Sequence, residues 1–439
     1  MPHITRRHFV TGALASTAMI SASEAFADDK GLPFPEHFTR QPGHSDIASD
    51  ETFWSQVASY YDVKPGIINV ENGNWGIMSR PVMQAYFAHT QRVNRDNSYF
   101  SRKEYWPVMK PVWHDVANRL NVLPEEVCLT RGATEALQNL IGNYQLLKAG
   151  DGVMFADLDY DAMQAAMRHK AGTTGADIIE LSIPEPADKA SLLQFYRTEL
   201  EKHPHCKLLL LTHISHRTGL VIPVAEITDI AKARGVDVIV DAAHSWGQLN
   251  FTADELKADF IGFNMHKWMG APIGAGAMFI RHARLQDIGL NMSSEPEQQD
   301  SIRGRVHSGT SNFAAFLTLP DAFRFHDLIG ADAKAARLKY LRKIWVDAVS
   351  DIEEINVLTP NEDESHAGIT SFRLAGKVST QENKAIADYL FKKHGIFTVH
   401  REGIAAGSCV RITPGYYNSS QDMQTVSAAL KDTVVAFRG

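Results

Sequence analysis

The sequence predicts an α/β protein built on a large, mostly parallel sheet of seven strands between layers of helices. Between Val127 and Arg281, short apolar segments alternate with segments of helical periodicity, as in repeated strand–helix units. The apolar segments are nearly continuous, which is typical of parallel strands covered by helices on both faces. The expected strands are Val127–Thr130, Gly152–Ala156, Ile178–Leu181, Lys207–His213, Val236–Asp241, Phe260–Phe263 and Gly276–Ile280.

A smaller α+β domain is expected after this sheet. The chain has 439 residues, a length that suggests at least two domains. We expect the large domain over residues 72–320 and the small C-terminal domain over residues 321–439. Residues 28–71 would form an N-terminal arm with a helix from Asp50 to Ala58. The strands expected in the small domain lie near Gly368–Leu374, Thr398–His400 and Val410–Ile412.

The first 27 residues have the pattern of a twin-arginine signal peptide. Arg6 and Arg7 precede a mildly apolar stretch, and a small-x-small cleavage site follows at Ala25–Ala27. The stretch is too short and too rich in Ser, Thr and Gly to span a membrane, so we expect no stable membrane anchor. We therefore expect export to the periplasm by the twin-arginine translocation machinery, with cleavage near Ala27.

Charge and cysteine content argue against a nucleic-acid-binding protein and against a disulfide-rich one. The formal net charge is −7, from 44 basic and 51 acidic residues, and no block of Lys and Arg indicates a nucleic-acid surface. The three cysteines, Cys128, Cys206 and Cys409, are an odd, low number for an exported chain, which argues against a disulfide framework. We expect neither a nucleic-acid partner nor a bound metal.

Lys267 carries the strongest indication of chemistry. It follows the strand Phe260–Phe263, among apolar residues where a lysine cation is costly to desolvate. This cost is avoided when the lysine amine forms a Schiff base with pyridoxal 5′-phosphate (PLP). PLP also needs an acid at its pyridine nitrogen. Asp241 ends the strand Val236–Asp241, at the edge where parallel sheets bind ligands. The pair predicts a PLP enzyme.

The neighbours of this pair suggest further roles. Lys267 would form the internal aldimine and then serve as the base that moves the substrate's Cα proton. Asp241 would keep the pyridine nitrogen protonated, so that the ring withdraws electrons from Cα. His244 would contact the ring oxygen or the substrate; a structural histidine is the equal alternative. His266 is a candidate phosphate contact.

Other motifs complete a predicted PLP site. Gly132, Ala133 and Thr134 begin a helix after a strand, where free amides and a hydroxyl suit a phosphate; a simple capped helix is the alternative. Tyr160, after the next strand, would stack on the ring or pack in the core. Arg411 lies mid-strand and would grip a substrate carboxylate or form a buried structural ion pair.

Taken in order from Asn72 to Asn418, these motifs resemble the class V aminotransferases, which are fold type I PLP enzymes. The segment around Trp75 resembles the isopenicillin N epimerase-like branch, and twin-arginine-exported relatives tailor the siderophore pyoverdine in the periplasm. The resemblance implies a homodimer with shared active sites, because Thr310 would reach the phosphate of a second subunit. The implied cofactor contacts are Gly132, Ala133, Thr134, Tyr160, Ser215, Asp241, His244, His266, Lys267 and Thr310, and the implied substrate contacts are Arg411 and Asn74.

The expected function is that of a periplasmic PLP enzyme acting at Cα of an amino acid or of an amino-acid moiety in a secondary metabolite. Aminotransferase-like chemistry is the first reading; epimerisation and carbon–sulfur lysis are alternatives, and a non-catalytic PLP-fold binding module is a remote one. Cysteine desulfuration is not expected, because the segment from Ile396 to Arg411 is short and its cysteine, Cys409, lies two residues from Arg411. By position alone, specificity would depend on the Trp75 loop, on Tyr99–Trp106 and on His400–Arg401.

Overall fold

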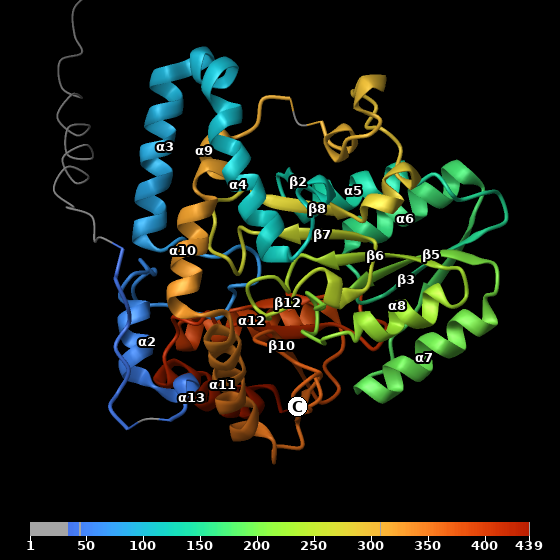
Figure 1. Cartoon of the computed structure of the whole chain (residues 1–439). Coiled ribbons are helices and arrows are strands. Elements are labelled where there is room, and N and C mark those ends of the chain that lie inside the picture. Colours follow the sequence, from blue (N-terminus) through green and yellow to red (C-terminus); the bar gives the residue numbers. More distant parts are fainter. Residues whose placement is uncertain (1–33, 44, 308, 439) are drawn as a thin grey trace, which may run out of the picture. The chain divides into compact units, whose positions relative to one another are not determined.

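The computed structural model describes residues 34–43, 45–307 and 309–438 (Figure 1). Residues 34–439 form one compact unit. The predicted signal peptide lies outside the described residues. Among the described helices, none is long and apolar enough to cross a membrane.

The predicted seven-stranded sheet is present, with the strand order β2-β8-β7-β6-β5-β3-β4. Neighbouring strands from β4 to β7 pair in parallel, whereas β8 runs antiparallel to both β7 and β2. A loop without a helix joins β7 to β8, and such a connection suits an antiparallel pair. The strands are β2 (Val127–Thr130), β3 (Gly152–Ala156), β4 (Asp177–Leu181), β5 (Cys206–Thr212), β6 (Asp237–Ala242), β7 (Phe260–Asn264) and β8 (Gly276–Ile280).

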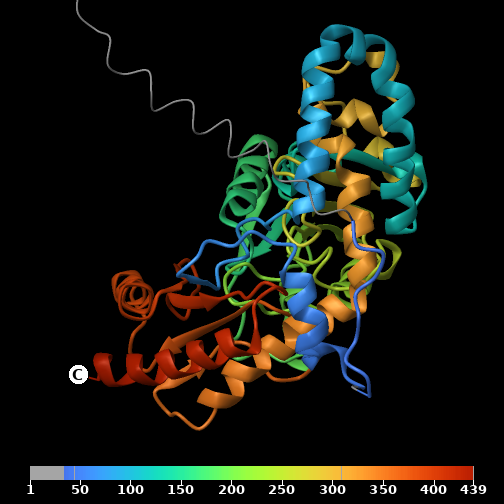
Figure 2. The ribbon, with the colours of Figure 1, turned by 90° about the vertical axis from the view of Figure 1, so that its left-hand side faces the viewer.

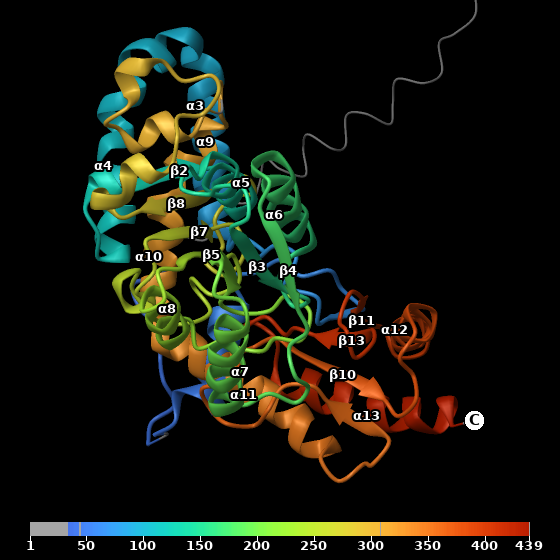
Figure 3. The same ribbon diagram turned by 90° about the vertical axis from the view of Figure 1, so that its right-hand side faces the viewer.

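Helices cover both faces of this sheet (Figure 3). Successive residues of a strand point to opposite faces, so Leu208 packs in one core cluster and Leu209 in the other. Met163 of α6 shares the cluster of Leu208, and Ile227 of α8 shares that of Leu209. The helices that cover the sheet are α4 (Tyr105–Leu120), α5 (Ala133–Asn143), α6 (Asp161–Thr174), α7 (Lys189–Lys202) and α8 (Val224–Lys232).

A helical hairpin projects from the body at the top of Figure 2 and was not anticipated by the sequence analysis. It consists of α3 (Arg80–Tyr99), a π-helical turn (Phe100–Glu104) and α4, and α9 (Phe313–Leu317) packs against α3. The predicted helix near the N-terminus is present as α2 (Glu51–Ala58), and the Asp50 side chain caps it by accepting from the Phe53 amide at 3.1 Å.

The C-terminal part contains a four-stranded antiparallel sheet with the order β12-β13-β10-β9. The three strands expected there are all found. Its elements and their connections are α10 (Leu319–Ile329), α11 (Ala331–Val349), β9 (Ile355–Val357), β10 (Thr370–Leu374), α12 (Thr380–His394), β11 (Ile396–Phe397), β12 (Val399–Arg401), β13 (Cys409–Ile412) and α13 (Ser420–Phe437).

One short pairing joins a segment near residue 68 to the C-terminal part. The strand β1 (Ile68–Asn69) pairs in parallel with β11, and Glu71 forms a bridge with Thr413 just beyond β13. This pairing brings the segment after β1 against the C-terminal sheet. The chain boundary proposed at residue 71 between arm and large domain stays a prediction, since residues 34–439 form one compact unit.

Candidate active site

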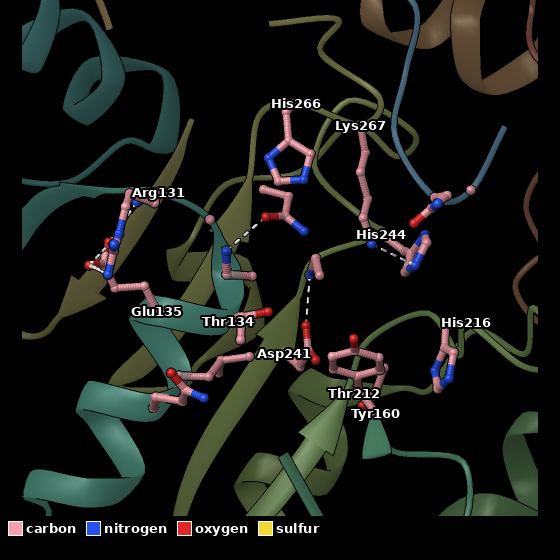
Figure 4. Close-up of a pocket in the computed structure, with 18 of the residues that line it drawn as sticks. Arg131, Thr134, Glu135, Tyr160, Thr212, His216, Asp241, His244, His266 and Lys267 are labelled. Carbon is pink, nitrogen blue, oxygen red and sulfur yellow. Dashed lines mark hydrogen bonds and ion pairs between the residues drawn. The ribbon is translucent and has the colours of Figure 1, made fainter. Parts of the chain in front are cut away.

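A cavity of about 480 Å³ opens at the carboxyl ends of β5, β6 and β7 (Figure 4). This is the edge at which open parallel sheets bind ligands, as the sequence predicted. The start of α5 closes one end of the cavity, and the C-terminal sheet supplies two arginines. The lining residues are Gly73, Asn74, Arg131, Gly132, Ala133, Thr134, Glu135, Leu137, Gln138, Tyr160, Thr212, His216, Asp241, Ala243, His244, Asn264, His266, Lys267, Arg401 and Arg411.

Lys267 projects into this cavity from the loop after β7. Its Nζ lies 2.9 Å from Nε2 of His244. The pKa of Lys267 is lowered to about 8, chiefly by desolvation and also by the positive charges of Arg411 and Arg401, and the Asp241 carboxylate opposes this shift. A lysine with this pKa supplies a neutral amine near neutral pH, which both Schiff-base formation and proton abstraction require.

Asp241 is 3% exposed and faces the same cavity from β6. Its carboxylate accepts a hydrogen bond from the Ala243 amide at 2.9 Å. Burial raises the pKa of Asp241, although the nearby Lys267 amine lowers it. A cation placed against this carboxylate would keep it ionised, and a protonated pyridine nitrogen is such a cation. The residues present therefore fit PLP at this end.

His244 lies between Lys267 and the small-domain arginines. Burial, assisted by the charge of Lys267, lowers the pKa of His244 well below its usual value, so the imidazole is neutral. Among the described residues, its Nδ1 atom has no hydrogen-bond partner. A buried nitrogen without a partner is costly, which fits a ligand contact at this atom.

The start of α5 forms the opposite end, where a phosphate was expected. Gly132 and Thr134 line the cavity together with His266, whose Nδ1 lies 3.1 Å from the Ala275 carbonyl oxygen. A Cβ atom at Gly132 would lie 2.9 Å from Oδ1 of Asn264, so the strand-to-helix turn needs glycine there. The amide of Ala133 donates to that same Oδ1 at 2.7 Å. This amide is thus already paired within the protein, and the phosphate contact of Ala133 stays a prediction.

Tyr160 lines the cavity as the residue that precedes α6. In Figure 4 it lies across the cavity from Lys267, as a ring-stacking residue would. Its ring centroid lies 5.2 Å from that of His216, and the two rings are perpendicular. The sequence analysis gives His216 no role, although it lines the cavity. The one signal for it in the sequence is its position shortly after the end of the strand β5.

Ser215, expected to contact the cofactor, makes hydrogen bonds within its own turn. It is fully buried, and its Oγ accepts from the Arg217 amide at 3.2 Å and donates to the Leu158 carbonyl at 3.3 Å. Its neighbour His216 and the strand-end residue Thr212 line the cavity in its place. The cofactor contact of Ser215 stays a prediction.

Arg411 forms the buried ion pair that the sequence analysis gave as its alternative role. Its Nη2 lies 2.5 and 2.6 Å from the two carboxylate oxygens of Glu71, and its Nη1 donates to the His216 carbonyl at 2.6 Å. Arg411 nevertheless lines the cavity, as do Asn74 and Arg401. The ion pair and the predicted substrate contact are therefore compatible.

Other residues predicted from position lie elsewhere. Thr310 lines a separate hollow beside α3 and not the cavity of its own chain. Tyr99–Trp106 form the tip of the hairpin between α3 and α4 and do not contribute to the residues that line the cavity. The expected contact of Thr310 with the phosphate of a second subunit stays a prediction.

Replacing Gly76 by alanine is expected to lower the free energy of unfolding by about 1–3 kcal/mol, the usual effect of overpacking. A Cβ atom there would lie 1.9 Å from the Lys267 carbonyl oxygen, and the Gly76 amide donates to the His266 carbonyl at 2.9 Å. Urea unfolding measures the change. The control Gly142→Ala, with nothing within 4 Å of its added Cβ, should match or exceed the wild type.

Comparisons with known proteins identify the family. The sequence model of the family described as "Aminotransferase class-V" matches residues 80–426. The isopenicillin N epimerase of Streptomyces clavuligerus is 23% identical over 394 residues, which cover 86% of this chain and 97% of that protein. A probable cysteine desulfurase of Vibrio cholerae is 28% identical over 329 residues, covering 71% of this chain and 78% of that protein.

Solved structures show the same fold. The apo cysteine desulfurase of Thermococcus onnurineus superposes with a TM-score of 0.73 at 21% identity, over 87% of this chain and 98% of that one. A C-DES mutant with glycine covalently linked to its PLP cofactor superposes with a TM-score of 0.71 at 20% identity, over 84% and 97% of the two chains. The predicted fold, an α/β PLP-enzyme fold of type I, is thus confirmed.

Proposed function

The chain belongs to the class V aminotransferase family, and on that basis we propose that it is a PLP enzyme acting at Cα of an amino acid or of an amino-acid moiety in a larger metabolite. One observation carries the proposal: the Lys267 amine and the buried Asp241 carboxylate open into one cavity. A non-catalytic binding module would need neither group.

When bound, PLP withdraws electrons from the substrate's Cα and so makes the Cα proton removable. Asp241 would hold the positive charge at the ring nitrogen, and Tyr160 would support the ring from across the cavity. Thr134 and His266 mark the phosphate end. With a pKa of about 8, Lys267 takes the Cα proton as a neutral amine, and the neutral His244 accepts a hydrogen bond from it when it is charged.

Aminotransferase-like chemistry is our first proposal for the reaction, and epimerisation is the second. Both begin with removal of the Cα proton, for which Lys267 is the proposed base, and they differ in where a proton is then returned. Epimerisation is supported by the similarity to isopenicillin N epimerases, which extends over 86% and 87% of this chain for two of them. Carbon–sulfur lysis, the reaction of the cystine lyase C-DES, is a third possibility on the same fold.

Desulfuration by a cysteine nucleophile is not proposed. Such a nucleophile must be a thiolate close to the substrate. Burial raises the pKa of Cys409 to about 11 and that of Cys128 and Cys206 to about 12. Within the part of the chain that the structure describes, none of the three lines the cavity. The Cys409 thiol donates instead to the Arg217 carbonyl at 3.7 Å.

We further propose a periplasmic homodimer. The location is supported by Arg6, Arg7 and the small-x-small site at Ala25–Ala27. Shared active sites are supported by Thr310, which lies outside the cavity of its own chain. Fractionation of cells and sedimentation of the purified mature protein test the two parts separately.

Product analysis distinguishes the reactions. The purified holoprotein is incubated in D₂O with a panel of L- and D-amino acids. Keto acid formed in proportion to the enzyme, with bleaching of the yellow cofactor band, indicates transamination. Inversion at Cα with deuterium incorporation and without keto acid indicates epimerisation. If neither deuterium exchange nor product appears with any amino acid or amino-acid-containing metabolite tested, the proposal is wrong.

The rate at which PLP combines with the PLP-free protein should depend on pH through Lys267. The pKa of Lys267 is lowered to about 8, so the neutral, nucleophilic fraction rises about tenfold per pH unit below pH 8 and levels off above it. For a lysine with an ordinary pKa, the neutral fraction, and with it the rate, would keep rising up to about pH 10.4. Stopped-flow absorbance from pH 6 to 10 measures this. A rate that still rises steeply above pH 9 would contradict the assignment.

A further inference from the structure

Lys334 on α11 is a buried lysine that the proposed reaction does not use. It is 1% exposed, and its Nζ donates to the Trp268 carbonyl at 2.6 Å and lies 2.9 Å from Nδ1 of His326. The same atom lies 4.5 Å from the centroid of the Tyr416 ring. Burial lowers the pKa of Lys334 to about 7, and the charge of Asp327 opposes this shift. Because burying a lysine is costly, its hydrogen bonds are the reason to expect for its place in the core.

The contact with Trp268 acts on the loop that carries Lys267. Trp268 directly follows Lys267 in the chain. The amide of Gly76 donates to the His266 carbonyl at 2.9 Å, and the amide of Gly270 donates to the Lys267 carbonyl at 3.4 Å. Three successive carbonyl groups are thus held, and the bond from Lys334 is the shortest of the three. It fixes the peptide unit from which the Lys267 side chain departs.

The aromatic residues beside Lys334 extend the same cluster to a second segment of the cavity wall. The hydroxyl groups of Tyr416 and Tyr61 lie 2.7 Å apart, and the Tyr61 ring packs on that of Tyr417 with centroids 4.9 Å apart. The Tyr417 hydroxyl donates to Oδ1 of Asn72 at 2.5 Å. Asn72 directly precedes two residues that line the cavity. One buried cluster therefore supports both the Lys267 loop and the loop after β1.

This cluster also joins the C-terminal part of the chain to the large sheet. Lys334, His326 and Tyr416 all lie beyond residue 320, whereas Trp268 belongs to the loop between β7 and β8. The hydrogen bond from Lys334 is therefore a direct connection between the C-terminal helices and the loop of the reacting amine.

We propose that Lys334 is a positioning residue, which holds the peptide unit after Lys267 and thereby keeps the Lys267 amine inside the cavity beside His244. The inference rests on the proposed function, because it takes Lys267 as the reacting amine. Lys334 acts through the main chain and touches neither substrate nor cofactor.

Pulse acetylation of the PLP-free protein with acetic anhydride from pH 6 to 10 tests this, with the label on Lys267 measured by mass spectrometry. Only the neutral amine reacts, so the midpoint of the pH profile reports the pKa of Lys267. That pKa is about 8 in the wild type. Lys334→Met releases the Trp268 carbonyl, so the Lys267 amine gains contact with water. The midpoint should rise by about one pH unit or more, toward the ordinary value of about 10.4.

The holoprotein gives a second readout. Lys334→Met should slow the exchange of the substrate's Cα proton for deuterium by about tenfold or more, because a misplacement of about 1 Å in a reacting group can cost about 100-fold in rate. Lys334→Gln keeps a shorter, neutral donor, and it should shift both readouts in the same direction by less.

Arg342→Met is the matched control. Arg342 is a cation on the same helix, is 2% exposed, and donates to the Thr359 carbonyl at 3.1 Å. Its hydrogen bonds hold residues 359–370 and not the Lys267 loop. Arg342→Met should therefore leave the acetylation midpoint and the rate of deuterium exchange unchanged, whatever its melting temperature.

The outcomes separate this inference from the proposed function. A wild-type midpoint in Lys334→Met overturns the inference, and if that variant does not fold, a wild-type midpoint in Lys334→Gln does so. Equal shifts in Lys334→Met and Arg342→Met would reveal a general loss of structure and would also overturn it. A protein without a visible band after PLP is added overturns the proposed function instead, and acetylation of the PLP-free protein still tests the role of Lys334.

Discussion

Lys267→Ala is expected to lose the visible absorbance of lysine-bound PLP together with activity. Proton transfer by a positioned base contributes about 10²–10⁴-fold to rate, and the covalent attachment of the cofactor is lost as well. The Lys267 amine faces the cavity, 2.9 Å from Nε2 of His244. Among the described residues that line the cavity there is no other lysine, so no second amine can replace it. Absorbance after PLP addition, and turnover with the best substrate, measure the two losses.

We also expect Lys267→Ala to keep the stability of the PLP-free protein. Because Lys267 is desolvated, its pKa is lowered to about 8, and removing the amine relieves a cost to the folded state. The PLP-free variant should therefore be at least as stable as the PLP-free wild type. The control Lys343→Ala removes a lysine that is 69% exposed on α11, and it should retain the band and the activity. Retained activity in Lys267→Ala would contradict the enzymatic account.

Asp241→Asn is expected to keep the cofactor band but to lower kcat by about 100-fold or more. The substitution leaves a buried cation at the ring nitrogen without its partner, and breaking a buried pair costs about 3–5 kcal/mol. Each 1.36 kcal/mol in the barrier is about tenfold in rate. The ring would then lose its proton and withdraw electrons less strongly.

Steady-state and single-turnover kinetics measure this change. The matched control is Asp177→Asn at the start of β4, where the aspartate side chain is 67% exposed. It should retain the wild-type kcat. If Asp241→Asn matched that control, Asp241 would not be the partner of the ring nitrogen.

The large sheet could be predicted from the sequence because each strand is indicated by the apolar residues of its own short segment. Most strands from β2 to β8 are short and mainly apolar, and the structure shifts their bounds by about one residue. The hairpin of α3 and α4 was not predicted, because much of α3 is exposed and polar and its apolar periodicity is weak.

The positions of the catalytic candidates also followed from local pattern. Lys267 and Asp241 each follow or end a buried strand, and the carboxyl ends of parallel strands meet at one edge. Local sequence patterns could not show which hydrogen-bonding groups near the cavity already have a partner within the protein. The Ala133 amide is paired with Asn264, 131 positions away, and the Ser215 hydroxyl is used within its turn.

The end of the cavity that Arg411 lines depends on contacts between distant parts of the chain. Glu71 and Arg411 are 340 positions apart, and the two-residue strands β1 and β11 bring them together. Pairings this short have no periodicity of their own. The sequence therefore indicated Arg411 as a cavity residue but not Glu71 as its partner.

The most direct test of the central claim is to map the lysine that binds PLP. The purified mature protein is loaded with PLP, its visible spectrum is recorded, and it is reduced with borohydride and digested for mass spectrometry. We expect a visible band and a pyridoxyl label on the peptide that contains Lys267. The closest rival is Lys334, which is also buried but donates to the Trp268 carbonyl at 2.6 Å and does not line the cavity. A label on Lys334, or no band after PLP is added, would contradict the account.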